Sequence, residues 1–167
     1  MVNYDAIYAL LGDLTPLTAD CGAVCAAACC KGGDNEGMLL FPDEAAYLFC
    51  EDRIVRENGR ELYVCDGTCD RDLRPLSCRL FPLFPIVTDE GRIRAVYDPR
   101  AYHVCPLVQL NDNVRLDTAF VRAVRAVGRR IAADPAGLAF LKEQTAEIEE
   151  INRFLQLDKK RSPVCRR

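Results

Sequence analysis

The sequence predicts a mostly helical α+β fold. We expect a cysteine-ligated metal centre in the N-terminal half, a small β element, and a C-terminal antiparallel helical hairpin. Three observations predict this fold. All but one of the ten cysteines lie in the first 105 of 167 residues. The middle of the chain has short apolar stretches bounded by turn residues. The last third carries two long apolar stripes of helical period. We expect a single domain over residues 1–167, divided into a cysteine-cluster metal-binding part (1–112), a helical hairpin (113–157) and a basic tail (158–167).

Three helices are expected in the N-terminal part. Residues 2–12 have apolar side chains at a helical period. A second helix is predicted to begin at Asp20, a favourable N-cap residue, and to continue through the first cysteines. A third is predicted over residues 43–52, because Pro42 and the acidic residues after it are typical of a helix start.

The middle of the chain is expected to form short strands and turns. Residues 60–65 and 92–98 read as strands, the second by its clear alternation of apolar and polar residues. Between them, Pro75 can open a helical turn and Pro82 must end it, which places Cys78 within that turn.

Two long helices are predicted for residues 113–157. Asp134 and Pro135 make a tight connection, so the helices should run antiparallel. Arginines on the first and glutamates on the second recur at helical spacing, which favours an ion-pair seam over a nucleic-acid face. The two apolar stripes consist of Leu116, Phe120, Val124, Val127 and Ile131, and of Leu138, Leu141, Thr145, Ile148, Ile151 and Leu155.

Composition limits the classes of partner and compartment. The net charge is −3, which gives no general attraction to nucleic acid or to an anionic membrane. No basic, apolar leader and no apolar run of membrane-spanning length is evident, so neither a secretory signal nor a membrane segment is expected. We therefore expect a cytoplasmic protein, in which clustered cysteines more often bind metal than form disulfides.

The first cysteine cluster lies in "DCGAVCAAACCK", residues 20–31. Cys21, Cys25 and Cys29 are spaced by four, so a continuous helix would stack their thiols on one face. Cys30 would lie about 100° further round the axis. The alanines between them leave room for a bulky group near the backbone. The density of thiols therefore predicts a metal site rather than ordinary core packing.

The other half of the site is expected some 40 residues later. Cys65 and Cys69 flank a "DGT" turn that can fold both thiols inward. Cys105 is a weaker candidate that could equally be a core residue, and Cys50 is expected to be one. Cys165 is expected to have no role. The predicted metal ligands are Cys21, Cys25, Cys29, Cys30, Cys65, Cys69, Cys78 and Cys105.

The spacing leaves the metal open between zinc and an iron–sulfur cluster. Zinc sites commonly pair cysteines two to four residues apart, and these spacings fall in that range. Iron–sulfur clusters also take four thiolates and tolerate irregular spacing. Eight candidates exceed four ligands, which indicates two sites or one site with spare thiols. Arg74 and Arg79 could donate to cluster sulfurs, or equally pair with Asp70 or Asp72.

Together these motifs resemble the CxxCxxCC family of zinc- or iron-chelating proteins. The first cluster ends in a Cys-Cys pair, and "CDGTCDRDLRPLSCRLFP" follows about 35 residues later. The matching residues lie between 20 and 85, with three-residue gaps in the first element where the family's short form has two. The matching residues are Cys21, Cys25, Cys29, Cys30, Cys65, Cys69, Arg74, Pro75, Cys78, Arg79, Phe81 and Pro82.

The resemblance implies metal binding and little else about activity. We expect a protein that holds an iron–sulfur cluster or zinc through clustered cysteines, with no catalysis established. Two alternatives stay open: a cluster-dependent redox or protein-modifying enzyme, and a protein that stores or transfers metal ions. The expected partner is a metal ion or cluster, with neither nucleic acid nor membrane involved.

Overall fold

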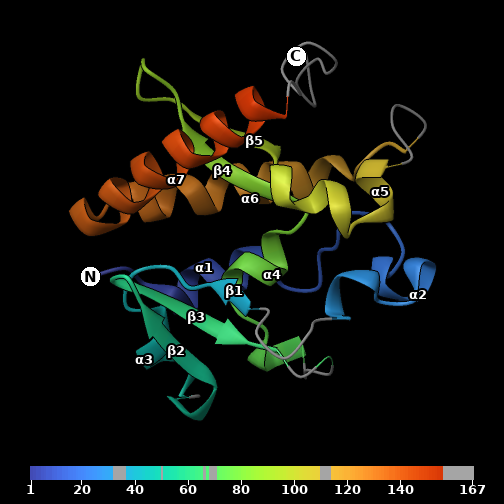
Figure 1. Cartoon of the computed structure of the whole chain (residues 1–167), viewed down its shortest axis with the longest axis horizontal. Coiled ribbons are helices and arrows are strands. Elements are labelled where there is room, and N and C mark those ends of the chain that lie inside the picture. Colours follow the sequence, from blue (N-terminus) through green and yellow to red (C-terminus); the bar gives the residue numbers. More distant parts are fainter. Residues whose placement is uncertain (32–36, 50, 66, 68–70, 110–113, 156–167) are drawn as a thin grey trace.

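The computed structural model describes residues 1–167 except 32–36, 50, 66, 68–70, 110–113 and 156–167. It has an α+β architecture, as the sequence predicted, with helices and two small antiparallel sheets (Figure 1). The predicted basic tail at 158–167 lies outside the described residues, as do Cys50, Cys69 and Cys165. The α-helices are α1 (Tyr4–Leu11), α2 (Cys21–Cys25), α3 (Glu44–Leu48), α4 (Leu76–Leu80), α5 (Pro106–Gln109), α6 (Thr118–Ala132) and α7 (Pro135–Phe154).

Short 3-10 helices and strands connect these helices. The 3-10 helices are η1 (Ala28–Cys30), η2 (Glu51–Arg53), η3 (Arg71–Leu73) and η4 (Pro99–His103). The strands are β1 (Gly37–Leu39), β2 (Ile54–Glu57), β3 (Arg60–Val64), β4 (Leu83–Val87) and β5 (Ile93–Tyr97). The strands predicted over 60–65 and 92–98 are therefore confirmed as β3 and β5. The helix predicted over 43–52 is much shorter, because Phe49 takes a left-handed conformation that ends α3.

The first sheet has the strand order β1-β3-β2, and both of its pairings are antiparallel. Met38 of β1 lies opposite Tyr63 of β3, and Val55 of β2 lies opposite Leu62. Tyr63 is buried, whereas three of the four residues of β2 are exposed. The sheet therefore presents one side to the core and leaves β2 as a solvated edge strand.

The second sheet is the hairpin β4–β5, which packs against α6 and α7 (Figure 1). Every residue of β4 is buried. Its contact with α6 depends on Gly128, because a Cβ atom there would lie 2.6 Å from Cβ of Pro85. Glycine thus lets the helix backbone approach the strand closely.

The apolar stripe predicted for the first long helix is buried in α6 and just before it. Phe120, Val124, Val127 and Ile131 are each 0% exposed. On α7, Thr145 interrupts the stripe for a structural reason: its hydroxyl accepts a hydrogen bond from the backbone N–H of Val87 on β4. This hydroxyl also donates to the carbonyl of Leu141.

The predicted ion-pair seam between the two long helices is wrong. In the described part of the chain, Glu143 and Glu147 on α7 both bind Arg60 of β3, each at 2.9 Å, and no ion pair joins them to the arginines of α6. The glutamate stripe therefore faces the first sheet. Helical periodicity places charges on one face of a helix but does not say which element that face meets.

A buried carboxylate joins the N-terminal helices. Glu44 of α3 is 0% exposed and accepts hydrogen bonds from the Tyr8 hydroxyl and from the backbone N–H groups of Phe41 and Leu76. Burial raises the pKa of Glu44, while these donors favour its charged form. Across residues 1–155 as far as they are described, no helix has the length and hydropathy to cross a membrane.

Candidate metal centre

The first cysteine cluster begins as a helix and then breaks. The Asp20 side chain accepts a hydrogen bond from the backbone N–H of Gly22, which confirms the predicted N-cap. However, α2 ends at Cys25, and the prediction of one helix through Cys29 is wrong. Ala26 and Ala27 both take left-handed conformations, with φ of 51° at each. The chain then turns into η1, which contains Cys29 and Cys30.

This backbone is unfavourable for its residues. A left-handed conformation costs an L-residue about 1–2 kcal/mol, and alanine is otherwise the best helix former. Two consecutive alanines in this region are therefore held by something other than local preference. Within α2 and η1, all of whose residues are described, no side chain is fully buried. Core packing therefore explains little of this conformation.

The break still leaves the thiols close enough to influence one another. Burial raises the pKa of Cys21, and the nearby Cys25 raises it further. Burial also raises the pKa of Cys29, which is hydrogen-bonded to Cys30 and feels the charges of Cys21 and Cys25. Cys25 thus influences the pKa of both Cys21 and Cys29, across a sharp turn rather than along the continuous helix that was expected.

Cys105 belongs with this group, although it was the weakest candidate in the sequence. It is buried between η4 and α5, and the backbone N–H groups of Leu107 and Val108 donate hydrogen bonds to its sulfur. Burial raises its pKa, and its charge acts on both Cys21 and Cys29. No spacing in the sequence indicates this neighbour, since it lies 75 or more positions away. Its own sequence segment, "HVCPL", shows only a cysteine at a position where a helix can start.

The second predicted element lies beside the first. Cys65 follows β3 and is half-buried. At Gly67, a Cβ atom would lie 3.2 Å from the carbonyl oxygen of Cys30, so this turn packs directly against η1. Cys69 lies outside the described residues. Cys78 is half-buried on α4. The structure thus brings Cys65 toward Cys30.

In the described ranges, no three side chains among His, Cys, Asp and Glu are arranged to hold a single metal ion. No disulfide joins the cysteines that the structure describes. Some of these thiols nevertheless influence one another electrostatically, as the raised pKa values of Cys21 and Cys29 indicate. Thiolates remain the right donors for zinc and for iron–sulfur clusters.

The two arginines near Cys78 have different roles. Arg79 donates to the backbone carbonyls of Arg74 and Arg71, and its guanidinium lies 4.6 Å from the ring centre of Tyr8. These contacts account for Arg79 as a structural residue. The positive charge of Arg74 instead acts on Cys21 and favours its thiolate form.

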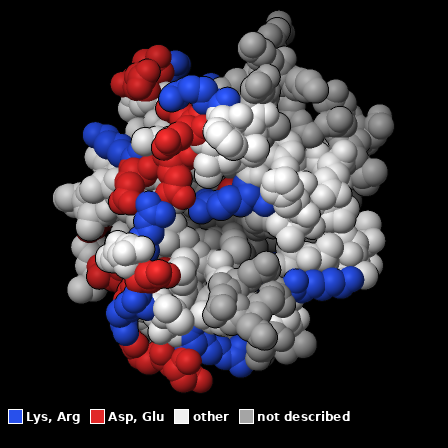
Figure 2. Space-filling model, in the orientation of Figure 1, with Lys and Arg blue, Asp and Glu red and all other residues white. Residues whose placement is uncertain are grey.

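The charged residues are unevenly distributed. Figure 2 shows acidic and basic side chains gathered over the side formed by α7 and the β2–β3 hairpin. The opposite side of that face, over α2 and α5, shows few charged side chains among the described residues. The carboxylate of Asp20 is nevertheless close enough to Cys21 to raise its pKa.

Comparison with family models, curated proteins and solved structures finds no match to this chain.

Proposed function

We propose that this chain binds an iron–sulfur cluster through clustered thiolates, with Cys21, Cys25, Cys29 and Cys105 as ligands. The observation that carries this proposal is the segment of residues 21–30. It holds four thiols, buries no side chain fully, and contains two alanines in a conformation they disfavour. Metal ligation would supply the free energy that packing does not, because binding to a folded site stabilises that site.

The electrostatics of the group support a cation among the thiols. The three thiols with raised pKa values feel one another's charge, so all of them together as thiolates would repel. A bound metal reverses this relation, since a coordinating thiol is deprotonated by the metal's charge. Arg74 adds a second positive charge near Cys21.

Cys105 has the surroundings of a thiolate ligand. Two backbone N–H groups, from Leu107 and Val108, donate to its sulfur. Such hydrogen bonds stabilise negative charge on sulfur, and they are among the features that set the potential of iron–sulfur clusters.

An iron–sulfur cluster accommodates the irregular spacing of these cysteines in the sequence better than a single zinc ion does. One zinc requires four ligands about 2.3 Å from a common point, which the described side chains do not offer. An iron–sulfur core places its own atoms between the thiolates and so bridges a wider set. Cys30, Cys65 and Cys78 then remain as spare thiols or as part of a second site.

The test is anaerobic purification followed by analysis of iron, acid-labile sulfide and zinc. We expect iron and sulfide in equal amounts, with broad visible absorption. Colourless protein with stoichiometric zinc would replace the cluster with a zinc site. Protein with neither metal, purified or reconstituted, would contradict metal binding altogether.

The neighbouring cysteines provide a matched pair of variants. Cys29→Ser should abolish cluster binding, because Cys29 interacts with both thiols of α2. Cys30→Ser, one residue away, should retain most of the iron. Equal retention in both variants would show that the ligand lies elsewhere.

A further inference from the structure

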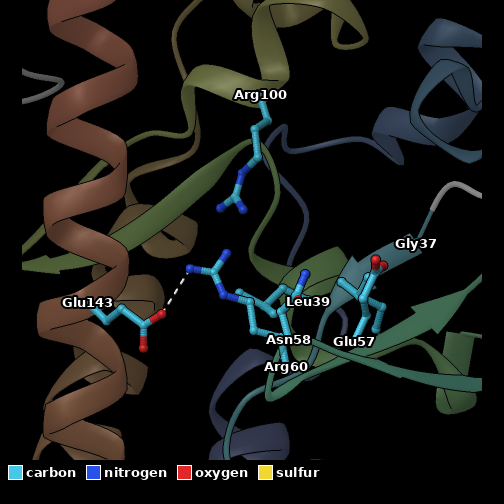
Figure 3. Close-up of a pocket in the computed structure, with 8 residues that line it drawn as sticks. Gly37, Leu39, Glu57, Asn58, Arg60, Arg100 and Glu143 are labelled. Carbon is cyan, nitrogen blue, oxygen red and sulfur yellow. Dashed lines mark hydrogen bonds and ion pairs between the residues drawn. The ribbon is translucent and has the colours of Figure 1, made fainter.

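A cavity of about 470 Å³ lies between the first sheet and the α7–η4 side of the molecule (Figure 3). Its size is in the range typical of small-molecule sites. Among the described residues no cysteine lines it, so it is separate from the proposed metal centre. The lining residues are Gly37, Leu39, Glu57, Asn58, Arg60, Leu62, Arg100 and Glu143.

Two guanidinium groups from different elements face one another in this cavity. Arg100 of η4 and Arg60 of β3 point toward each other in Figure 3. Burial and the positive charge of Arg60 act to lower the pKa of Arg100, while Asp98 and Glu147 raise it above its ordinary value. A carboxylate placed between two guanidinium groups would relieve this repulsion and accept hydrogen bonds from both.

Both arginines are held in position and keep donors available. Arg100 uses Nε and Nη2 to bind the carboxylate of Asp98, whose side chain is only 7% exposed. Arg60 uses Nη2 to bind Glu143 and Glu147. In the described part of the structure, Nη1 of each arginine has no hydrogen-bond partner. Fixed guanidinium groups with spare N–H donors are suited to a planar anionic group.

The cavity is not simply an anion site, because its charges balance. Two arginines and two glutamates line it, Glu57 and Glu143 being the acidic pair. Among the described residues, no hydrogen bond or ion pair engages the side chains of Glu57 and Asn58. Glu143 binds Arg60 through Oε1. A ligand with one positive and one negative group matches this lining better than a free anion does.

We propose that this cavity binds a small zwitterion, a free α-amino acid or a short peptide. Its carboxylate pairs with Arg60 and Arg100, and its ammonium with the glutamates. Leu39 and Leu62 provide an apolar surface for an aliphatic side chain. Figure 2 shows a hollow near the centre of this face bordered by basic side chains, which leaves the cavity open to solvent.

Isothermal titration of the full chain tests this assignment. The probes are the standard L-amino acids, one at a time, and dialanine. For each ligand that binds, its N-acetyl derivative lacks the positive charge and its amide derivative lacks the negative charge. We expect binding by at least one zwitterion and a loss of about tenfold or more for both derivatives. Tighter binding of dialanine than of alanine would identify the peptide as the source. No binding by any probe at millimolar concentration would overturn the proposal.

Matched variants locate the binding. Arg60→Lys keeps the ion pairs with α7 but loses the guanidinium fork, and Glu57→Gln removes a charge with no protein partner. Both should weaken binding about tenfold. The control is Arg92→Lys, in an exposed arginine–glutamate pair on the β4–β5 hairpin, which should change nothing. Unchanged affinity in both cavity variants, or an N-acetyl derivative bound as well as the zwitterion, would contradict the assignment.

Discussion

The helix α6 and the cysteine segment of residues 21–30 are stabilised in different ways. Helix α6 has seven buried residues, and its local preference, its cap and its packing all favour the same structure. The cysteine segment has no fully buried side chain in α2 or η1, and its two left-handed alanines oppose local preference. The difference indicates that the hydrophobic core stabilises one region, while under the proposed function ligation would stabilise the other.

The largest effect should come from α6. Phe120→Ala removes a side chain that is 0% exposed, and we expect the free energy of unfolding to fall by about 3–5 kcal/mol, with metal or without it. Urea unfolding measures this change. Phe154→Ala is the control, because Phe154 is 85% exposed and should cost less than about 0.5 kcal/mol. A small effect at Phe120 would remove the contrast between the regions.

A second effect is expected at Glu44, whose carboxylate joins the core to α4. Glu44→Gln should lower the free energy of unfolding by about 1–3 kcal/mol. The NH₂ group of the glutamine would face the backbone N–H of Phe41, so two donors would meet where a donor and an acceptor met before. Denaturant unfolding across a pH series measures both this loss and its pH dependence.

The pH dependence has a definite sign. The pKa of Glu44 is raised in the folded state, so the folded protein binds this proton more tightly than the unfolded chain does. Its contribution to stability is therefore present below the ordinary value of 4.5 and is lost as the pH rises through the folded-state pKa. We expect Glu44→Gln to remove this component. The exposed variant Glu90→Gln should retain it, and an unchanged profile in Glu44→Gln would contradict the assignment.

The smallest effect should appear in the cysteine segment. Ala26→Gly relieves a left-handed alanine and should stabilise the metal-free segment by roughly 0.5–1 kcal/mol. Amide hydrogen exchange of residues 21–30 measures this local change. Ala23→Gly is the matched control inside α2, where glycine should destabilise by about the same amount. The same sign in both variants would show that the left-handed turn is not strained.

Much of the fold could be predicted because its determinants are local. The 3.6-residue period identified the buried face of α6, and the N-cap at Asp20 was recognisable from residue type alone. Alternation along residues 92–98 predicted β5. The seam between the long helices could not be predicted in this way, since Glu143 and Glu147 bind Arg60, which is far away in sequence.

The candidate site shows the same difference between local and long-range determinants. The sequence by itself determined where the candidate ligands and their charged neighbours lie: dense thiols in residues 20–31, a second group around Cys65, and arginines beside Cys78. Only the tertiary structure decided how they group. It broke the helix at Ala26, where helix propensity favours continuation, and it brought Cys105 to the first cluster. Residue type and spacing encode local preference, whereas long-range packing selects which distant segments meet, and it can impose a conformation that the local residues disfavour.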